Sequence, residues 1–142
     1  MSAGQEFISK RGPEPVGPYP HARRVGDLLF ISGIGPRRRG EKSIPGVRMD
    51  AAGNVIDYDI AEQCKAVFEN IRWIIEDAGA KWENIVDVTS FLTNMERDFA
   101  GYNQVYEAYL GTVRPTRTTV EVRALPTKIN VELKVIVWMG GA

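Results

Sequence analysis

The sequence predicts an α+β domain in which two helices cover one face of a mixed β-sheet. Two segments, at about 59–78 and 96–110, carry apolar residues at helical spacing, and one β-branched segment, NIVDVTSFLTN (84–94), lies between them. Strand-like segments come before the first helix and after the second, so the predicted order is β-β-β-α-β-α-β-β. The 142 residues are 44% apolar and 25% charged, which is typical of one globular domain.

The N-terminal part of the chain predicts an arm followed by short strands. Residues 1–20 are rich in Gly, Pro and Ser, and we expect an extended arm that precedes a single domain spanning 21–142. The segment HARRVGDLLFISG (21–33) predicts two strands joined by a turn. The short stretch 55–56 is expected to add a third strand at an edge.

Both helices carry recognisable boundary signals. Asp59 is expected to cap the first helix, and Glu62 completes a capping-box pattern, while Gly79 ends the helix. Its apolar stripe consists of Ile60, Cys64, Val67, Phe68, Ile71, Ile74, Ile75 and Ala78. Gly111 follows the second helix, whose apolar face is formed by Phe99, Tyr102, Tyr106, Tyr109 and Leu110.

The last two strands are expected over 116–124 and 130–138, joined as a hairpin by a short turn around LPTKIN. A symmetric turn would place Arg123 opposite Glu132 and Glu121 opposite Lys134. Opposite charges that face each other across a strand pair are mildly stabilising, so a solvated face with ion pairs is one interpretation.

A second interpretation of this face is a protein interface. Alternation in the first of these strands puts four polar side chains together: Arg117, Thr119, Glu121 and Arg123. In the expected hairpin, Ile136 and Trp138 lie on the same face, and apolar side chains of this size are typical of interfaces. Two helices cover only one face of the sheet, so we expect an oligomer that buries the other.

Composition excludes several classes of function. Eighteen basic and eighteen acidic residues cancel, so the net charge does not favour binding to nucleic acid or to an anionic membrane. Cys64 is the only cysteine and His21 the only histidine, which excludes a disulfide framework and a Cys/His zinc site built from one chain. The sequence contains no apolar run long enough for a membrane helix and no secretory signal, so the expected compartment is the cytoplasm.

The stretch PTRTTVEVRALP (115–126) resembles the signature of the Rid family, the YjgF-type imine and enamine deaminases. The segments GPYPHARRVGDLLFISG, DFAGYNQVYEAYL and VELKVIV resemble further motifs of that family in the right order. The resemblance implies a chorismate-mutase-like domain, a homotrimer with active sites in clefts between subunits, and a small-molecule reaction without a cofactor or metal.

Within the family, the chain is most similar to the 2-aminomuconate deaminases. The similar features are the start GPEPVGPYPH and the arginine-rich loop RRRGEKSIPG. This similarity implies hydrolysis of 2-aminomuconate to 4-oxalocrotonate (2-oxohex-3-enedioate) and ammonia in the degradation of aromatic amino compounds. One alternative is a broad deaminase for 2-imino acids and 2-aminoacrylate. Another is a non-enzymatic chaperone-like protein, or a ribonuclease or translation inhibitor.

The resemblance also implies roles for individual residues. Arg117 matches the arginine that binds the substrate carboxylate, a task suited to a planar, two-pronged guanidinium. Glu132 matches the glutamate that orients the attacking water and transfers a proton. The remaining matches are Gly33 and Thr119 in the pocket lining, Tyr19 over the cleft and Asn103 on the second helix.

Each of these roles competes with a structural interpretation. Arg117 could form a cross-strand ion pair, and Glu132 could pair with Arg123. Tyr19 could be a packing aromatic residue, and Asn103 could form a local helix hydrogen bond.

The remaining candidates are a histidine and several arginines. His21 could assist proton transfer or be structural. A second substrate carboxylate would need its own cation, and the candidates near Gly33 are Arg23, Arg24, Arg37, Arg38 and Arg39.

Overall fold

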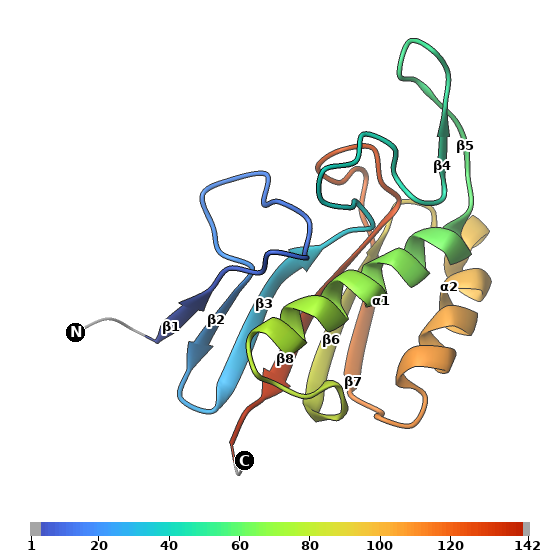
Figure 1. Cartoon of the computed structure of the whole chain (residues 1–142). Coiled ribbons are helices and arrows are strands. Elements are labelled where there is room, and N and C mark those ends of the chain that lie inside the picture. Colours follow the sequence, from blue (N-terminus) through green and yellow to red (C-terminus); the bar gives the residue numbers. More distant parts are fainter. Residues whose placement is uncertain (1–3, 141–142) are drawn as a thin grey trace.

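A computed structural model describes residues 4–140 and contains one six-stranded mixed sheet with two helices (Figure 1). The sheet order is β1-β2-β3-β8-β6-β7, and β4 and β5 form a separate two-stranded ribbon. The strands are β1 (Gln5–Phe7), β2 (Ala22–Val25), β3 (Leu28–Ile34), β4 (Val47–Met49), β5 (Val55–Tyr58), β6 (Ile85–Leu92), β7 (Thr116–Glu121) and β8 (Val131–Trp138). The helices are α1 (Ile60–Asp77), the 3-10 turn η1 (Trp82–Asn84) and α2 (Met95–Leu110). The predicted α+β fold class is confirmed.

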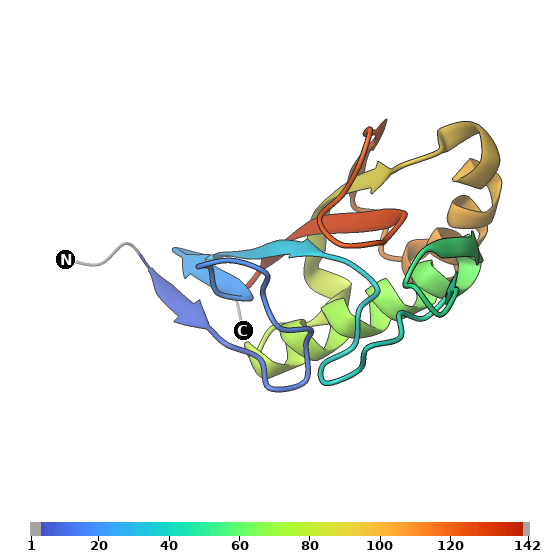
Figure 2. The same cartoon turned by 90° about the horizontal axis from the view of Figure 1, so that it is seen from above.

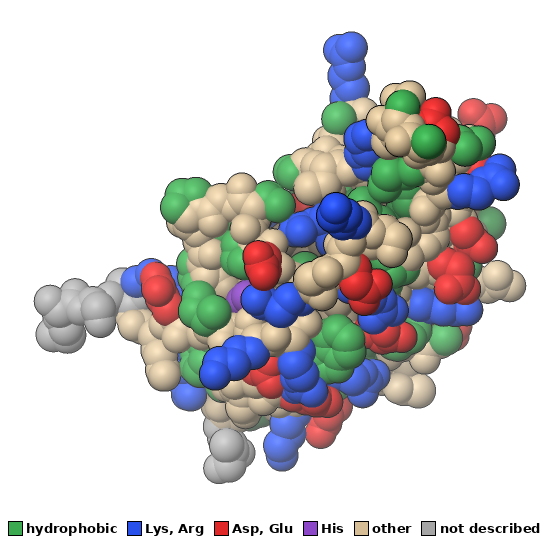
Figure 3. Space-filling view, turned by 45° about the horizontal axis from the view of Figure 1, so that its top comes forward, with side chains coloured by type: hydrophobic (Ala, Val, Ile, Leu, Met, Phe, Trp, Pro, Cys, Tyr) green, Lys and Arg blue, Asp and Glu red, His purple; other side chains and the backbone are tan. Residues whose placement is uncertain are grey.

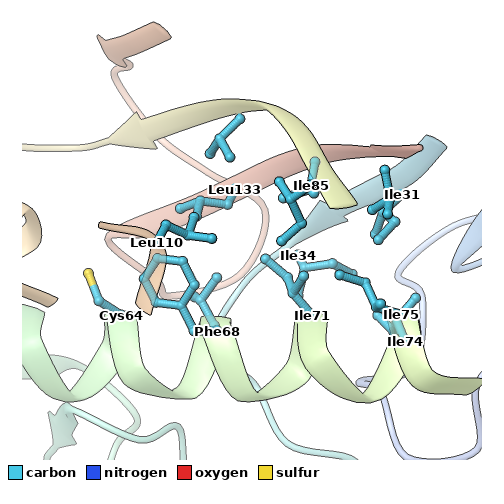
Figure 4. Packing of buried hydrophobic residues seen from close by; sticks show 14 of the residues in the cluster. Ile31, Ile34, Cys64, Phe68, Ile71, Ile74, Ile75, Ile85, Leu110 and Leu133 are labelled. Carbon is cyan, nitrogen blue, oxygen red and sulfur yellow. The ribbon is translucent and has the colours of Figure 1, made fainter. Parts of the chain in front are cut away.

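The hydrophobic core lies between the helices and one face of the sheet (Figure 2). Figure 4 shows Phe68, Ile71 and Ile75 of α1 pointing toward Ile31 of β3 and Leu133 of β8. All five side chains are almost fully buried. The helical stripe predicted from the sequence is therefore the core-facing side of α1, and Cys64 in that stripe is a packing residue.

The boundaries of α1 follow from its end residues. The side chain of Asp59 accepts a hydrogen bond from the N–H of Glu62 at 3.2 Å, as expected for an N-cap. The reciprocal half of the capping box is not formed, because the N–H of Asp59 donates to the carbonyl of Gly46 at 2.7 Å. Gly79 has φ of 77°, a conformation that glycine adopts without steric cost at a helix C-terminus.

The expected hairpin between the last two strands is wrong. Strand β6 lies between β7 and β8, so that β7 pairs with β6 in parallel while β8 pairs with β6 and β3 in antiparallel directions. The segment β6–α2–β7 is a crossover unit, which requires parallel neighbours. The chain then passes over β6 through the loop 122–130 before entering β8 (Figure 2).

This pairing changes which side chains share a face. Arg117 lies in register with Val88 of β6, which in turn lies in register with Val135 of β8, and both valines are fully buried on the helix side. Glu132 lies in register with Phe91 on the opposite, open face. The expected pairs Arg123–Glu132 and Glu121–Lys134 therefore do not form.

The open face of the sheet carries an apolar patch on β3 and β8. Leu28 is in register with Trp138, and Phe30 is in register with Ile136. Trp138 is 43% exposed and Phe30 is 36% exposed in the single chain. Among residues 4–140, no helix is long and apolar enough to cross a membrane.

The N-terminal segment belongs to the domain more closely than its composition indicated. Strand β1 pairs with β2, with Phe7 opposite Ala22. The chain then folds over the end of β3 (Figure 1), and Ser9 is 2% exposed there. The Oγ of Ser9 donates to Asp77 at 2.7 Å and accepts from the N–H of Gly12 at 2.9 Å. These contacts anchor the described part of the expected arm, residues 4–20, to the end of α1.

Candidate active site

A pocket of about 380 Å³ lies where the N-terminal loop meets the ends of β3 and β8. The lining residues that carry chemistry are Tyr19, Gly33, Arg37, Glu132 and Lys134. Charged and hydrophobic side chains alternate on the surface at this end of the molecule (Figure 3). A cavity of this size, with few polar groups on an apolar frame, is typical of a small-molecule site.

Glu132 is one of the two acidic residues that line this pocket, and the other is Glu14. Its side chain is half-buried and forms no hydrogen bond or ion pair within residues 4–140. Burial raises the pKa of Glu132, and the positive charge of Arg37 partly opposes that shift. The expected alternative, an ion pair with Arg123, is therefore ruled out, and the carboxylate is available to a ligand.

Gly33 provides the space that Glu132 occupies. A Cβ at this position would lie 2.6 Å from Oε2 of Glu132, closer than non-bonded atoms approach. The neighbouring Ser32 fixes the strand end, because its Oγ donates to the carbonyl of Pro20 at 2.7 Å. The sequence-based placement of Gly33 in the pocket lining agrees with this geometry.

Tyr19 lies at the mouth of the pocket and is 40% exposed. Its hydroxyl accepts a hydrogen bond from the N–H of Val16 at 3.2 Å. The ring is therefore held in place by the N-terminal loop without being packed into the core, which favours the ligand-facing interpretation over the packing one.

His21 is buried and both ring nitrogens are engaged. Nδ1 accepts a hydrogen bond from the N–H of Ser9 at 2.9 Å. Nε2 lies 2.7 Å from the carbonyl oxygen of Pro13 and must carry the proton, since a carbonyl only accepts. The geometry therefore supports a structural role, in which the neutral imidazole holds the N-terminal loop against β2.

The structure separates the candidate arginines. Only Arg37 lines the pocket, where Nη2 donates to the carbonyl of Glu14 at 2.8 Å. Arg24 lies at the opposite end of β3, where it donates to the carbonyl of Gly26, so the structure does not place it beside Glu132 as expected. The other three also lie outside the lining: Arg23 beside Glu6, Arg38 beside Glu69, and Arg39 beside Glu14.

Arg117 lies on β7 against α2, where it forms a second cluster. Its Nη1 donates to Oδ1 of Asn103 at 2.8 Å. The guanidinium carbon lies 4.7 Å from the ring centre of Tyr106 and 5.2 Å from that of Tyr102, distances typical of cation–π contacts. Phe99 adds a third ring at 5.8 Å.

No carboxylate within residues 4–140 forms an ion pair with Arg117, so the cross-strand ion pair is excluded. The side chain of Asn103 does more than form a local helix hydrogen bond, because its Oδ1 accepts a hydrogen bond from the Arg117 guanidinium. The hydroxyl of Tyr106 is buried and has no hydrogen-bond partner in the described part of the chain. Thr119 lies on the same face of β7, two residues from Arg117. The cluster therefore presents a guanidinium whose charge no carboxylate of residues 4–140 neutralises by an ion pair.

Sequence reasoning missed the aromatic cage. Phe99, Tyr102 and Tyr106 were expected on one face of the second helix, but only as packing residues. Tyr102 is buried and its hydroxyl bonds to Ser90 Oγ, which fixes the ring beneath Arg117. An arginine on the strand that follows an aromatic-faced helix is the signal that could have indicated this arrangement.

The two clusters do not meet within one chain. Arg117 is on the helix face of an edge strand, and Glu132 is on the open face two strands away. Neighbouring strands are about 4.8 Å apart and residues about 3.3 Å apart along a strand. The two residues are thus separated by about 10 Å across the sheet and about 10 Å along it. Each chain therefore carries two separate clusters of candidate site residues, called half-sites below. One contains Arg117, Asn103 and Thr119, and the other contains Glu132, Gly33 and Tyr19.

Comparisons with known proteins cover nearly the whole chain. Residues 9–139 match the family described as Endoribonuclease L-PSP. A RutC family protein of Pyrococcus abyssi is 35% identical over 139 residues, which are 96% of this chain and 98% of that protein. A 2-iminobutanoate/2-iminopropanoate deaminase of Dermatophagoides farinae is 32% identical over 138 residues, again 96% of this chain and 98% of that protein.

Solved structures agree with the observed fold. The YjgF gene product of E. coli superposes with a TM-score of 0.79 at 28% identity, covering 94% of this chain and 98% of that one. E. coli TdcF with bound serine gives a TM-score of 0.80 at 28% identity, with the same coverage of both chains.

Proposed function

This chain belongs to the endoribonuclease L-PSP family, which includes the RutC and YjgF (Rid) proteins, and on this premise we propose that it is a hydrolase that deaminates an imine or enamine of a carboxylic acid. The observation that carries the proposal is Arg117, a half-buried guanidinium on aromatic rings that has no carboxylate partner among the described residues. A planar cation in this state is suited to binding a carboxylate with two parallel hydrogen bonds.

The proposed active form is a homotrimer in which the Arg117 half-site of one subunit faces the Glu132 half-site of its neighbour. Two features support this arrangement: the half-sites lie on opposite faces of one chain, and the apolar patch around Phe30 and Trp138 is exposed in a single chain. A cleft between subunits would bring a carboxylate-binding group and a proton-transfer group to the same substrate.

Glu132 would act as the general base and acid. As the water oxygen bonds to the protonated imine carbon, the π electrons of the C=N bond move to nitrogen and Glu132 accepts a proton from the water. Glu132 then donates that proton to the amine nitrogen. The C–N bond breaks as the hydroxyl gives its proton back to Glu132 and forms the carbonyl. The products are the 2-oxo acid and ammonia, which leaves as ammonium with the returned proton.

Burial of Glu132 suits this cycle. A carboxyl group with a raised pKa has a stronger affinity for the water proton than an exposed carboxylate has, and it still releases the proton to an amine. The half-site also excludes part of the solvent, so that hydrogen bonds to the reacting atoms are strengthened.

The proposed substrate is 2-aminomuconate. This enamine would first take a proton from solvent on carbon to give the protonated imine, and hydrolysis of that imine would give 2-oxohex-3-enedioate and ammonium. The N-terminal stretch GPEPVGPYPH and the arginine-rich loop support this choice, because the stretch lines the Glu132 pocket and the loop contributes Arg37 to it. The alternative is a broad 2-imino acid deaminase, which is supported by the activity named for the similar mite protein.

A nuclease or translation-inhibiting role, although the family description names a ribonuclease, has less support in this chain. The net charge is zero. The only histidine, His21, has both nitrogens engaged with the N-terminal loop.

The test is imine hydrolysis by purified protein with a panel of substrates: 2-aminomuconate, 2-iminobutanoate and 2-iminopropanoate. We expect hydrolysis of at least one, and a loss of about 100-fold or more in kcat/KM for Arg117→Ala. Arg117→Lys should recover only part of the activity, since one ammonium group cannot form the two parallel hydrogen bonds that a guanidinium forms with a carboxylate. Arg123→Ala is the matched control and should retain activity. A wild-type protein that hydrolyses none of the panel would reject the proposal.

A further inference from the structure

We propose that Arg37 binds a second acidic group of the substrate, so that the site selects dicarboxylic imines and enamines over monocarboxylic ones. The inference rests on the proposed function and names its substrate class. Its basis is that Arg37, alone among the five candidate arginines, lines the same pocket as Glu132.

The surroundings of Arg37 favour an anionic ligand. Its side chain is half-buried, and one of its five N–H donors bonds to the carbonyl of Glu14. No carboxylate among residues 4–140 lies within ion-pair distance of it. The side chain of Glu14, whose backbone carbonyl holds Arg37, is itself paired with Arg39 at 3.3 Å. The tether fixes the guanidinium at the pocket wall and leaves its other donors to a ligand.

Lys134 adds a second cation to the same wall. It lies two residues from Glu132 on the open face of β8, and its Nζ donates to the carbonyl of Ile31 at 3.0 Å. It also has no carboxylate partner in the described part of the chain. Glu14 also lines the pocket, but its carboxylate is paired with Arg39. The lining groups without an ion-pair partner among the described residues are therefore two cations and one carboxylate, which favours an anionic ligand.

A monocarboxylic substrate would leave this charge uncompensated. In the proposed site, Arg117 of the other half-site binds the substrate carboxylate beside the reacting carbon, and the reacting carbon itself must approach Glu132. The rest of the substrate then extends into the pocket toward Arg37. A neutral methyl or ethyl group there gains nothing from a guanidinium, whereas a carboxylate gains a charge-assisted hydrogen bond.

The test compares Arg37→Gln with Arg38→Gln on two imines that differ in their second carboxylate. Arg38 is a matched control because it follows Arg37 in the same loop but bonds to Glu69 outside the pocket. The substrates are 2-iminopropanoate and 2-iminoglutarate, which an amino-acid oxidase generates from alanine and glutamate with dioxygen as the oxidant. Arg37→Gln should lower kcat/KM about 10- to 100-fold on the dicarboxylic imine and less than about 2-fold on the monocarboxylic one.

A binding measurement keeps the inference testable without turnover. Calorimetry with hexanedioate and pentanoate should show that Arg37→Gln weakens the dianion about tenfold and leaves the monoanion unchanged, while Arg37→Lys recovers part of the affinity. Equal effects on both ligands, or none on either, would overturn the role of Arg37 even if imines are hydrolysed. Absence of all imine hydrolysis would instead reject the proposed function. The calorimetry would still decide whether Arg37 binds a second carboxylate.

Discussion

Gly33 and Glu132 occupy adjoining space so closely that any side chain at position 33 would collide with the carboxylate: the nearest approach of an added Cβ to Oε2 is 2.6 Å. Glu132 has no other contact that fixes its carboxylate among the described residues. The position of the proposed acid–base group therefore depends on the absence of a side chain on the neighbouring strand.

Gly33→Ala should fold normally and lose activity. Because the clashing atom is the end of a flexible side chain, the carboxylate of Glu132 can swing away without moving the backbone. We expect kcat to fall about 10- to 100-fold, since general acid–base catalysis of this kind contributes about 100- to 10,000-fold. Gly101→Ala is the matched control, because its Cβ would meet the flexible Ile60 side chain at 2.9 Å, outside the Glu132 pocket. Equal activity of the two variants would mean that the Glu132 position is not critical.

Glu132→Gln should abolish turnover and stabilise the protein at neutral pH. Burial raises the pKa of Glu132 in the folded state, so the folded protein holds this proton more tightly than the unfolded chain does. Ionisation therefore costs stability as the pH rises above the unfolded pKa of about 4.3. Thermal unfolding should give a higher Tm for Glu132→Gln than for wild type at pH 8 and little difference at pH 4. A lower Tm for the variant at pH 8 would contradict this assignment.

The sequence indicated the local structure well and the strand pairing poorly. Asp59 and Gly79 mark the ends of α1 because capping and left-handed backbone are properties of single residues. Alternation showed correctly that Arg117 and Thr119 share one face of β7. It could not show which face, because a period of two does not specify the neighbouring strand. That choice was made by the β6–α2–β7 crossover, which inserts β6 between β7 and β8.

The site was predictable to the same extent. Motif similarity selected Arg117 and Glu132, yet their separation onto two half-sites required the sheet order. The choice of Arg37 over Arg24 also required the structure. Arg24 lies nine residues before Gly33 and Arg37 four residues after it. The strand β3 runs from the turn beside Arg24 to the pocket at its other end, so only Arg37 reaches the pocket.

His21→Ala should destabilise the fold and leave the pH dependence of kcat unchanged. The substitution leaves the Ser9 N–H and the Pro13 carbonyl without partners in a buried place. An unsatisfied buried group costs about 1–3 kcal/mol, so we expect the free energy of unfolding to fall by about 2 kcal/mol or more. Urea denaturation and a pH–rate profile measure the two quantities. A variant with normal stability and an altered pH–rate profile would restore the proton-transfer interpretation.

Trp138→Glu should weaken self-association. Trp138 and Phe30 form part of the apolar patch on the open face, and a carboxylate there would be desolvated on assembly. Sedimentation should show wild type as a trimer, or a multiple of it, at micromolar concentration and Trp138→Glu as smaller species. Ile56→Glu on β5 is the control, since Ile56 is exposed but lies outside the main sheet. A wild-type protein that sediments as a stable monomer would reject the proposed assembly.

Mixing two inactive variants should restore activity. If each active site takes Arg117 from one subunit and Glu132 from the next, Arg117→Ala and Glu132→Gln homotrimers have no complete site. A mixed trimer contains sites in which the arginine comes from the Glu132→Gln subunit and the glutamate from the Arg117→Ala subunit. With random exchange at equal concentration, a site has an intact Arg117 in about half of the cases and, independently, an intact Glu132 in about half. About a quarter of the sites are then complete, so activity should reach about a quarter of the wild-type value.

The mixture must be refolded together from denaturant so that subunits exchange, and each variant refolded alone is the control. Mixing Arg117→Ala with Asn103→Ala should restore nothing, because Arg117 and Asn103 contact each other within one chain at 2.8 Å and belong to the same half-site. Recovery in the first mixture and not in the second would place the two half-sites on different subunits. A first mixture that stays inactive although native mass spectrometry shows mixed trimers would mean that Arg117 and Glu132 do not act on the same substrate molecule, because no single chain brings them together across β6.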